Sequence, residues 1–233
     1  MKKALDRLLT RAVPKTNTGT NACATSTVPK TNTGRNAGDT EIVRHFNEAA
    51  ADEENFPATI DPRIYHVQLI LEYFGELNGK RVLDVGCGKG RFARVLAERH
   101  PGASMVAFDL AEAMLRRVPE GIDPCAGSMT ALPFGAGAFD CAYATESLEH
   151  AVDIDGAVAE ICRVVKQGGR IVIIDKNAEQ WGRLETPEWE KWFGRKELEK
   201  LLGRHCRKVS SREISYWEDV APDGLFLAWM AEK

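Results

Sequence analysis

An acid and glycines alternate along one short segment of the chain, at Asp84, Gly86, Gly88 and Gly90. Glycines at a turn between a strand and a helix let backbone N–H groups approach a ligand closely. A second acid, Asp109, follows about 20 residues further on, a spacing that suits the hydroxyls of a ribose. These residue types in this order predict a site for an adenosyl group.

The same spacing distinguishes two kinds of adenosyl site. A dinucleotide site uses a third glycine for close packing of helix against strand, and this chain has Arg91 at that position. Asp84, just before the turn, would repel a pyrophosphate, whereas a carboxylate there can pair with an ammonium group. A nicotinamide-dependent oxidoreductase is therefore disfavoured.

The segment resembles motif I of the class I S-adenosylmethionine (AdoMet) methyltransferases. The resemblance implies that Asp84 serves the amino end of the methionine, beside Gly86 and Gly88, and that Asp109 holds the ribose. It also implies that Leu110 covers one face of the adenine. The alternative is structural, with glycines that only permit the turn and an acid that only caps the next helix.

A later loop strengthens the resemblance but departs from it at one position. Residues 127–134 (GSMTALPF) are similar to the family's Gly-Asp-Ala-x-x-Leu-Pro-Phe loop, which closes over adenine. The family's acid would accept the adenine amino group, and this chain has Ser128 in its place. A serine hydroxyl and the Met129 backbone can supply contacts, so weaker cofactor binding is expected.

Two acids and a histidine follow the expected strand that ends at Thr145: Glu146, Glu149 and His150. The string looks like the metal-binding segment of the ubiquinone-biosynthesis O-methyltransferases and of the small-RNA 3′-end 2′-O-methyltransferases. It implies a divalent cation that would lower the pKa of a substrate hydroxyl. The alternatives are that His150 is a general base or positioning residue, with Glu146 beside it, or that the segment is structural.

Aromatic residues are concentrated after the next expected strand, at Trp181, Trp189, Trp192 and Phe193. In this fold they lie on the substrate side of the cleft, where apolar walls with a few polar groups are usual. The alternative is that they pack this excursion onto the sheet. Three further aromatic residues can form a lid, namely Phe46, Phe56 and Tyr65.

The elements that must position these residues alternate between strand and helix along the chain. This alternation predicts an α/β fold: a seven-stranded, mostly parallel sheet with helices on both faces and an antiparallel C-terminal hairpin. Asp61 and Pro62 suit an N-cap and first turn, and Gly168 with Gly169 suits a helix end. Expected helices cover 41–50, 62–74, 91–99, 111–118, 154–166 and 195–202, and expected strands include 122–126, 141–145, 170–175, 206–217 and 225–232.

The first 40 residues differ from the rest in composition. Residues 1–13 can form a short amphipathic helix, and VPKTNTG occurs twice, at 13–19 and 28–34. A stretch this poor in large apolar residues cannot offset its own chain entropy, so a disordered or loosely docked extension is expected. Residues 41–233 are expected to form the AdoMet-dependent methyltransferase domain.

Composition limits the partners of the protein. The chain has 233 residues, a net charge of −3 and no basic or aromatic nucleic-acid module, so no nucleic acid is expected. It has no secretory signal and no apolar run near ~18 residues, which predicts a cytoplasmic protein that does not enter the membrane. Six cysteines without Cys-x-x-Cys spacing argue against zinc or redox chemistry.

The function that these residues predict is transfer of a methyl group from AdoMet to a small, partly apolar biosynthetic metabolite. The acceptor atom is expected to be oxygen or nitrogen, and less readily carbon. Two alternatives stay open: a protein of the same fold that binds AdoMet without transferring its methyl group, and a methyltransferase acting on RNA or protein. The sequence does not predict the oligomeric state.

Overall fold

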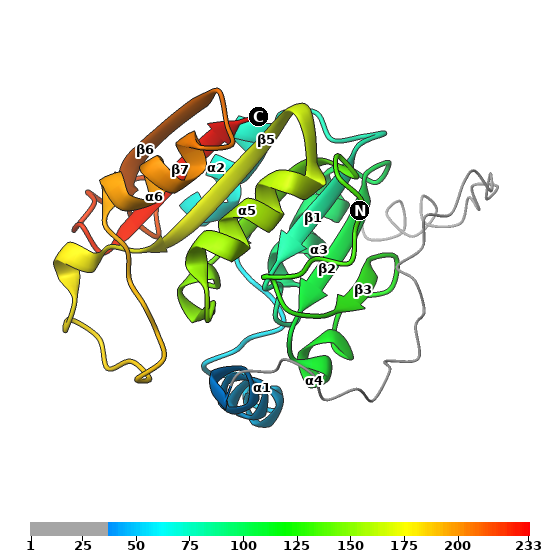
Figure 1. Ribbon diagram of the computed structural model, residues 1–233. Helices are drawn as coiled ribbons and strands as arrows, with labels where there is room; N and C mark the ends of the chain where they lie inside the picture. The colour runs from blue at the N-terminus through cyan, green and yellow to red at the C-terminus, as the bar shows by residue number, and fades with distance from the viewer. Residues whose placement is uncertain (1–36) are drawn as a thin grey trace, which may run out of the picture.

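The computed structural model describes residues 37–233, which Figure 1 shows as one twisted sheet between layers of helices. The predictions for the leading helix and the repeated VPKTNTG segments lie outside the described residues. The first described helix, α1 (Ala37–Ala49), begins slightly before the expected start at Glu41. The preceding Ala-Gly-Asp-Thr carries no large apolar residue, so the apolar pattern could not locate this end.

The seven strands lie across the sheet in the order β3-β2-β1-β4-β5-β7-β6. Neighbours from β3 to β5 are parallel, and β7 is antiparallel to both β5 and β6. The predicted sheet is therefore confirmed. The strands are β1 (Arg81–Val85), β2 (Ser104–Asp109), β3 (Asp123–Ala126), β4 (Phe139–Thr145), β5 (Val165–Lys176), β6 (Lys208–Ile214) and β7 (Phe226–Glu232).

Side-chain alternation along the strands separates two apolar layers, one on each face of the sheet. On β1, Leu83 and Val85 pack with α5 and α6, whereas Val82 packs with α2 and α3. In Figure 1, α5 and α6 lie in front of the sheet, and α2 and α3 lie behind it. These helices are α2 (Tyr65–Phe74), α3 (Arg91–Arg99), α5 (Ile154–Val164) and α6 (Arg195–Gly203).

The order of the strands creates a switch point beside β1. The chain lays β1, β2 and β3 toward one edge of the sheet and then places β4 on the other side of β1. Ligands of open α/β sheets bind beyond the carboxyl ends of the strands at such a point. Here α1 lies next to α4 (Glu112–Leu115), and the Ala113 N–H donates to Oδ1 of Asn47 at 2.9 Å.

The expected N-cap at Asp61 is wrong. Helix α2 begins at Tyr65, and its N-cap residue Ile64 forms no side-chain cap. The Asp61 carboxylate instead accepts hydrogen bonds from the backbone and guanidinium of Arg63, and its carbonyl accepts from the Ile64 N–H at 3.1 Å. Asp61 and Pro62 therefore form a turn ahead of the helix, since the local Arg63 pairing competes with capping.

The expected helix end at Gly168 and Gly169 is also wrong. Helix α5 ends at Val164 and β5 begins at Val165, so both glycines lie within the strand. Val165 pairs with Phe139, and the register then shifts before the pairing of β4 and β5 resumes. A Cβ on Gly169 would lie 2.6 Å from the Asp140 carbonyl oxygen, so glycine is needed where the strand passes this close.

Other elements differ from the expectation only in length: α4 and β6 are shorter than the expected 111–118 and 206–217. The five described cysteines are free and buried, and Cys125, Cys141 and Cys162 lie in the strands and the helix where the sequence places apolar side chains. No helix in residues 37–233 is long and apolar enough to cross a membrane.

Candidate cofactor and acceptor site

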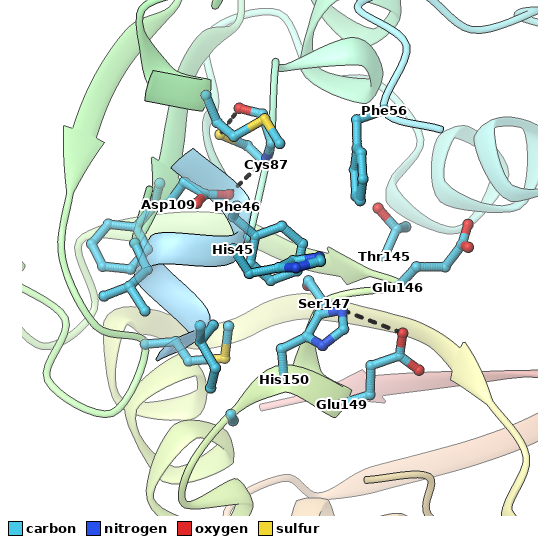
Figure 2. Close-up of a pocket in the computed structure, with 18 of the residues that line it drawn as sticks. His45, Phe46, Phe56, Cys87, Asp109, Thr145, Glu146, Ser147, Glu149 and His150 are labelled. Atoms are coloured by element: carbon cyan, nitrogen blue, oxygen red, sulfur yellow. Dashed lines mark hydrogen bonds and ion pairs between the residues drawn. The ribbon is translucent and has the colours of Figure 1, made fainter. Parts of the chain in front are cut away.

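A cavity of about 330 Å³ opens at the carboxyl ends of β1, β2 and β4 (Figure 2). Small-molecule sites commonly have volumes of roughly 300–1,000 Å³. Most predicted site residues line this cavity together. They are Gly86, Gly88, Asp109, Leu110, Ser128, Met129, Glu146, Glu149 and His150.

The turn between β1 and α3, residues 86–90, is called the glycine turn below. It needs glycine for reasons of both conformation and space. Gly86 has φ = 72°, in the region that side chains disfavour, and a Cβ there would lie 2.4 Å from Cβ of Ser147. Ser147 cannot easily move, because its hydroxyl donates to the Val85 carbonyl at 2.8 Å. The first glycine thus lets the turn pack against the residues that follow β4.

Asp109 links the glycine turn to the start of α4. Its Oδ2 accepts from the Gly88 N–H and its Oδ1 from the Ala111 N–H, each at 2.8 Å. Burial raises the pKa of this carboxyl, and the hydrogen bonds from Ala111 and Gly88 oppose that shift. These two hydrogen bonds hold the carboxyl at the cavity wall. The group that caps the start of α4 is thus the same group that was predicted to bind the ribose.

Asp84 is the exception among the predicted cofactor residues, because it does not line the cavity. It is buried beneath the glycine turn, and neither carboxylate oxygen has a hydrogen bond of normal geometry, although the Tyr143 hydroxyl lies beside it. Its pKa is raised to about 7, mainly by burial, with Tyr143 opposing the shift and the nearby Asp109 adding to it. Its contact with the amino end of the cofactor stays a prediction.

The loop at 127–134 contributes its first residues to the cavity. The Gly127 N–H donates to the Asp109 carbonyl at 3.0 Å, which places the loop beside the end of β2. The Ser128 hydroxyl lies 2.8 Å from the Thr130 hydroxyl, so it already has a partner within the loop. Its contact with adenine stays a prediction.

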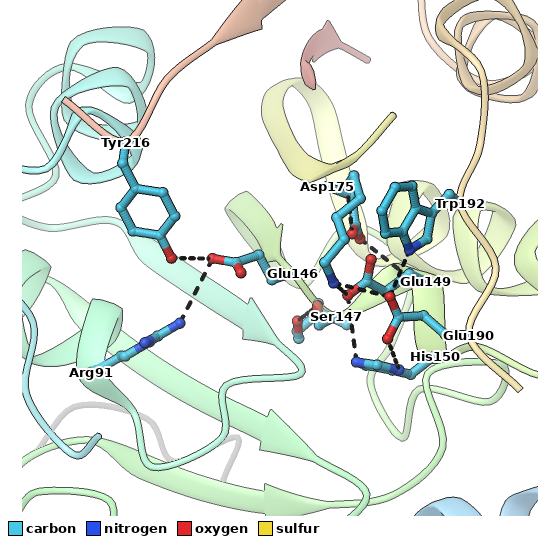
Figure 3. Close-up of polar contacts among 11 residues, drawn as sticks. Arg91, Glu146, Ser147, Glu149, His150, Asp175, Glu190, Trp192 and Tyr216 are labelled. Carbon is cyan, nitrogen blue, oxygen red and sulfur yellow. Dashed lines mark hydrogen bonds and ion pairs between the residues drawn. The ribbon is translucent and has the colours of Figure 1, made fainter. Parts of the chain in front are cut away.

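Glu146 does not join the expected metal-binding set. Outside glycine, it alone among residues 37–233 has a positive φ, of 49°, and its carboxylate turns toward Tyr216 and Arg91 (Figure 3). The Tyr216 hydroxyl donates to Oε1 at 3.0 Å, and Nη2 of Arg91 lies 3.8 Å from the same oxygen. The positive φ of Glu146 directs its side chain away from Glu149 and His150, although the three residues are close in the sequence.

A different acid completes the polar cluster around His150. Single ligand atoms of Glu149, His150 and Glu190 lie within 4.8 Å of one another. The Lys176 ammonium lies among them, hydrogen-bonded to Glu149 and, at 3.1 Å, to Oε1 of Glu190. A built-in cation therefore neutralises the carboxylates that a divalent ion would use. The sequence did not indicate that Lys176 and Glu190 belong to this site, because their contacts join segments that are far apart in the chain.

Burial controls the ionisation of this cluster. It lowers the pKa of His150 to about 4, against an opposing effect of Glu190, so the imidazole is neutral near pH 7. Burial and the neighbouring Asp175 raise the pKa of Glu149. Burial alone would lower the pKa of Lys176, but the surrounding carboxylates together raise it above its usual value. His150 can therefore accept a proton next to a permanently charged lysine.

Aromatic side chains from α1 and the following loop cover the cluster. Phe46 packs edge-on against His150 with ring centroids 4.9 Å apart, and Phe56 packs against Phe46 at 5.9 Å. Both line the cavity, as the predicted lid requires, whereas Tyr65 does not. None of the four aromatic residues expected as substrate walls lines the cavity: Trp181, Trp189, Trp192 and Phe193. Their segment contributes Pro187 and Glu190 to the lining instead.

The expected wall residues have mainly packing roles. The Trp192 indole N–H donates to Oε1 of Glu190 at 2.6 Å, and Trp181 packs on Trp192 with ring centroids 5.2 Å apart. Phe193 packs against Trp229 in the core. Trp189 contacts His45 of α1 at 5.2 Å and so joins the aromatic segment to the lid.

Comparison with known families places this geometry in one class. Residues 83–173 match the family model of a methyltransferase domain. The match runs from β1 to β5 and includes the turn after β1, so this part of the chain is similar to methyltransferase domains.

Relatives of similar sequence are named for different acceptors. A demethylmenaquinone methyltransferase from Renibacterium salmoninarum is 35% identical over 51% of this chain and 51% of its own length. A malonyl-[acyl-carrier protein] O-methyltransferase from Geobacter sulfurreducens is 31% identical over 53% of this chain and 48% of its own length. The chain thus spans about half the length of these relatives.

Solved structures share the fold at low sequence identity. The [4+2]-cyclase SpnF has a TM-score of 0.70 and 17% identity, covering 84% of this chain and 96% of its own. A geranyl diphosphate C-methyltransferase from Streptomyces coelicolor has a TM-score of 0.61 and 16% identity, covering 84% and 97%. Because one neighbour is named a cyclase, the fold alone does not define the reaction.

Proposed function

We propose that this protein transfers a methyl group from AdoMet to an oxygen or nitrogen atom, and less readily a carbon atom, of a small, partly apolar metabolite. The observation that carries the proposal is the shared cavity. It joins Gly86 and Asp109, which fit an adenosyl group, to the neutral imidazole of His150 under an aromatic lid.

The residues present fit AdoMet at the end of the cavity beside β2. The glycine turn leaves room for a close approach, and the Asp109 carboxylate is fixed where a ribose diol would need it. When bound there, AdoMet supplies a methyl group that its sulfonium has already activated. The residues of the chain therefore need to align the acceptor and exclude water, a proximity effect worth several kcal/mol.

His150 is the residue best placed to handle a proton. Its Nε2 lies 3.6 Å from Oε1 of Glu149, and its Nδ1 lies 4.0 Å from Oε2 of Glu190. A neutral imidazole in this position can accept the proton that a hydroxyl or amine loses as it is methylated. We assign His150 as the general base and Glu149 and Glu190 as the acids that surround it.

The proposal does not need a divalent cation. Glu149 and Glu190 already share the ammonium of Lys176, and Glu146 lies with Tyr216 and Arg91 instead. A metal would have to displace this lysine before it could bind both carboxylates. We therefore favour His150 as a base over the metal-binding alternative.

Methyl transfer to a panel of small hydroxyl, amine and carbon acceptors tests the proposal, with release of S-adenosylhomocysteine as the readout. We expect turnover with a small-molecule acceptor and a loss of roughly a hundredfold or more in His150→Ala, with S-adenosylhomocysteine affinity retained. Cofactor binding without turnover on small molecules, acyl carrier protein or RNA would instead support the binding-only alternative. Turnover on protein or RNA alone would contradict the small-molecule assignment.

A further inference from the structure

Two of the buried cysteines lie next to each other although they are far apart in the sequence. Cys162 is in the last turn of α5, and Cys206 lies between the end of α6 and the start of β6. Their Sγ atoms are 3.8 Å apart, the separation of a thiol hydrogen bond, and both thiols are free. The sequence contains no Cys-x-x-Cys motif, so here the fold brings the second thiol from another element.

The packing of α5 against α6 fixes this arrangement. The two helices lie side by side on one face of the sheet (Figure 1). Both cysteines belong to the apolar layer of that face, together with Ile161, Leu198 and Leu202. The Cys206 N–H donates to the Leu202 carbonyl at 2.9 Å, which holds the Cys206 backbone at the end of α6. The contact between the two sulfur atoms is therefore part of the packed core.

Cys206 is the member of the pair that lies nearer to solvent. It is 8% exposed, compared with 1% for Cys162, and its neighbours His205 and Arg207 are exposed. A small reagent can therefore reach Cys206 through a local movement of this turn. Neither cysteine lines the cavity, so the pair is separate from the candidate site.

The surroundings of Cys206 favour its ionised form. The pKa of its thiol is lowered, mainly by a hydrogen bond from Cys162, with burial opposing the shift and the Lys233 ammonium adding to it. That ammonium is held just after α5, where Nζ donates to the Val165 carbonyl at 2.7 Å. Because the thiolate is the reactive form of cysteine, Cys206 is the expected nucleophile of the pair.

We propose that Cys162 and Cys206 are a redox-active pair, which hydrogen peroxide oxidises to an intramolecular disulfide. The Cys206 thiolate first attacks a peroxide oxygen: an S–O bond forms, the O–O bond breaks, and the departing hydroxide takes up the proton that this thiol lost. Cys162 then attacks the sulfur of the resulting sulfenic acid: the S–S bond forms, the S–O bond breaks, and the hydroxyl leaves as water with the Cys162 proton. Two thiols and one peroxide thus give one disulfide and two water molecules.

The disulfide cross-links α5 to the segment ahead of β6. The two sulfur atoms must approach by roughly 1.8 Å to reach the usual disulfide bond length of about 2.05 Å. The cross-link then restricts the unfolded chain between residues 162 and 206, so the oxidised protein should resist denaturant better than the reduced protein. Because both cysteines lie outside the cavity, S-adenosylhomocysteine binding should be the same in both forms.

Mass spectrometry of the native full-length chain after treatment with hydrogen peroxide and blocking of free thiols tests the pair. We expect a peptide linkage between Cys162 and Cys206 that a reducing agent reverses. Cys162→Ala should prevent the linkage and leave Cys206 as a sulfenic acid or a more oxidised form, because the resolving thiol is missing. The matched control is Cys141→Ala, which removes a buried thiol on β4 and should leave the linkage in place.

Denaturant unfolding provides a second measurement. The oxidised wild type should unfold at a higher denaturant concentration than the reduced wild type, and Cys162→Ala should show no such gain. No linkage in the peroxide-treated wild type, or a linkage of either residue to another cysteine, would overturn the inference. The wild-type result stands even if a variant fails to fold. Because the linkage is detected without an adenosyl ligand, its outcome is independent of the proposed function.

Discussion

Lys176 determines how the acids at His150 behave. Its ammonium is largely buried, with a side-chain exposure of 13%, and it contacts Glu149 and Glu190, whose side chains are 1% and 4% exposed. Removing one partner of a buried ion pair leaves the other charges without compensation. The cluster therefore depends on lysine for stability as well as for its charge state.

We expect Lys176→Met to lower the free energy of unfolding by about 3–5 kcal/mol, because two buried carboxylates lose their cation. Denaturant unfolding measures this loss. Lys196→Met on the exposed side of α6 is the control and should change stability by less than about 0.5 kcal/mol. A Lys176→Met protein as stable as the wild type would show that the cluster is not held by this lysine.

Because of Lys176, we expect the methyl-transfer activity to be insensitive to chelators. Because Glu149 and Glu190 already bind Lys176, methyl transfer should continue at an unchanged rate in excess chelator and should not rise with added divalent ions. The measurement is the release of S-adenosylhomocysteine under both conditions. Activity abolished by chelator and restored by a divalent ion would revive the metal-binding interpretation of the segment.

At this scale, sequence patterns located residues whose roles are local. The glycines and Asp109 were predicted because turn geometry depends on neighbours in the chain. Asp84 does not line the cavity, and it lies between Leu83 and Val85, whose side chains face α5 and α6. Strand alternation therefore sends Asp84 to the α3 side, beneath the turn. Glu190 could not be predicted, because its contacts come from an irregular segment.

The turn between β1 and α3 is the element on which the adenosyl site depends. A methyl group on Gly86 would meet Ser147 at 2.4 Å and would force a side chain into φ = 72°. We expect Gly86→Ala to weaken S-adenosylhomocysteine binding at least about tenfold. Gly135→Ala, where nothing lies within 4 Å, is the control and should bind normally.

A double variant separates the effect of the clash with Ser147 from the effect of the unfavourable φ at residue 86. Gly86→Ala with Ser147→Gly removes the clash but keeps the unfavourable φ, so binding should recover only in part. Full binding by Gly86→Ala alone would mean that the turn adapts, and the account of its shape would be wrong. Calorimetry on the three proteins makes the comparison.

Helix α2 carries a buried, uncharged histidine that should make stability depend on pH. His66 packs against Tyr216 and Phe226, and neither of its ring nitrogens has a hydrogen-bond partner. Burial lowers its pKa to about 4, with a smaller opposing effect of Glu146 and a small lowering by Arg91. The unfolded chain therefore takes up a proton between pH 6.5 and 4 that the folded protein does not.

His66 should lower the free energy of unfolding as the pH falls from about 6.5 toward 4. Above pH 6.5 it should have no such effect. Between pH 7 and pH 5 the loss from His66 is at most about 2 kcal/mol. His66→Phe should lose correspondingly less stability than the wild type over the same interval, as measured by denaturant unfolding at both pH values. Equal losses in the two proteins would show that His66 does not titrate as proposed.

Elements were predicted well where apolar periodicity was strong and less well at their ends. The strands β1 and β2 and the helices on both faces follow directly from their apolar residues. The start of α2 was misplaced because Arg63 pairs with Asp61. The end of α5 was misplaced because Val165 already pairs with Phe139 across the sheet, a contact that no local pattern shows.

Across the whole molecule, the fold brings the turn after β1, Asp109, the His150 cluster and the aromatic residues Phe46 and Phe56 to one cavity. The lid comes from α1 and the loop after it, and Lys89 ties that loop to the glycine turn through Glu53. A solved structure with this fold is named a cyclase, and the relatives of similar sequence are named for different acceptors. The reaction must therefore be established at the cavity.

Calorimetric titration of the wild type and Asp109→Ala with S-adenosylhomocysteine tests the central claim most directly. Because Asp109 presents its carboxylate at the adenosyl end of the cavity, the wild type should bind and the variant should bind at least about tenfold more weakly. Unfolding measurements on both proteins should show that the variant is folded. No binding by the wild type, or equal affinity in a folded Asp109→Ala protein, would contradict the assignment of this cavity to AdoMet.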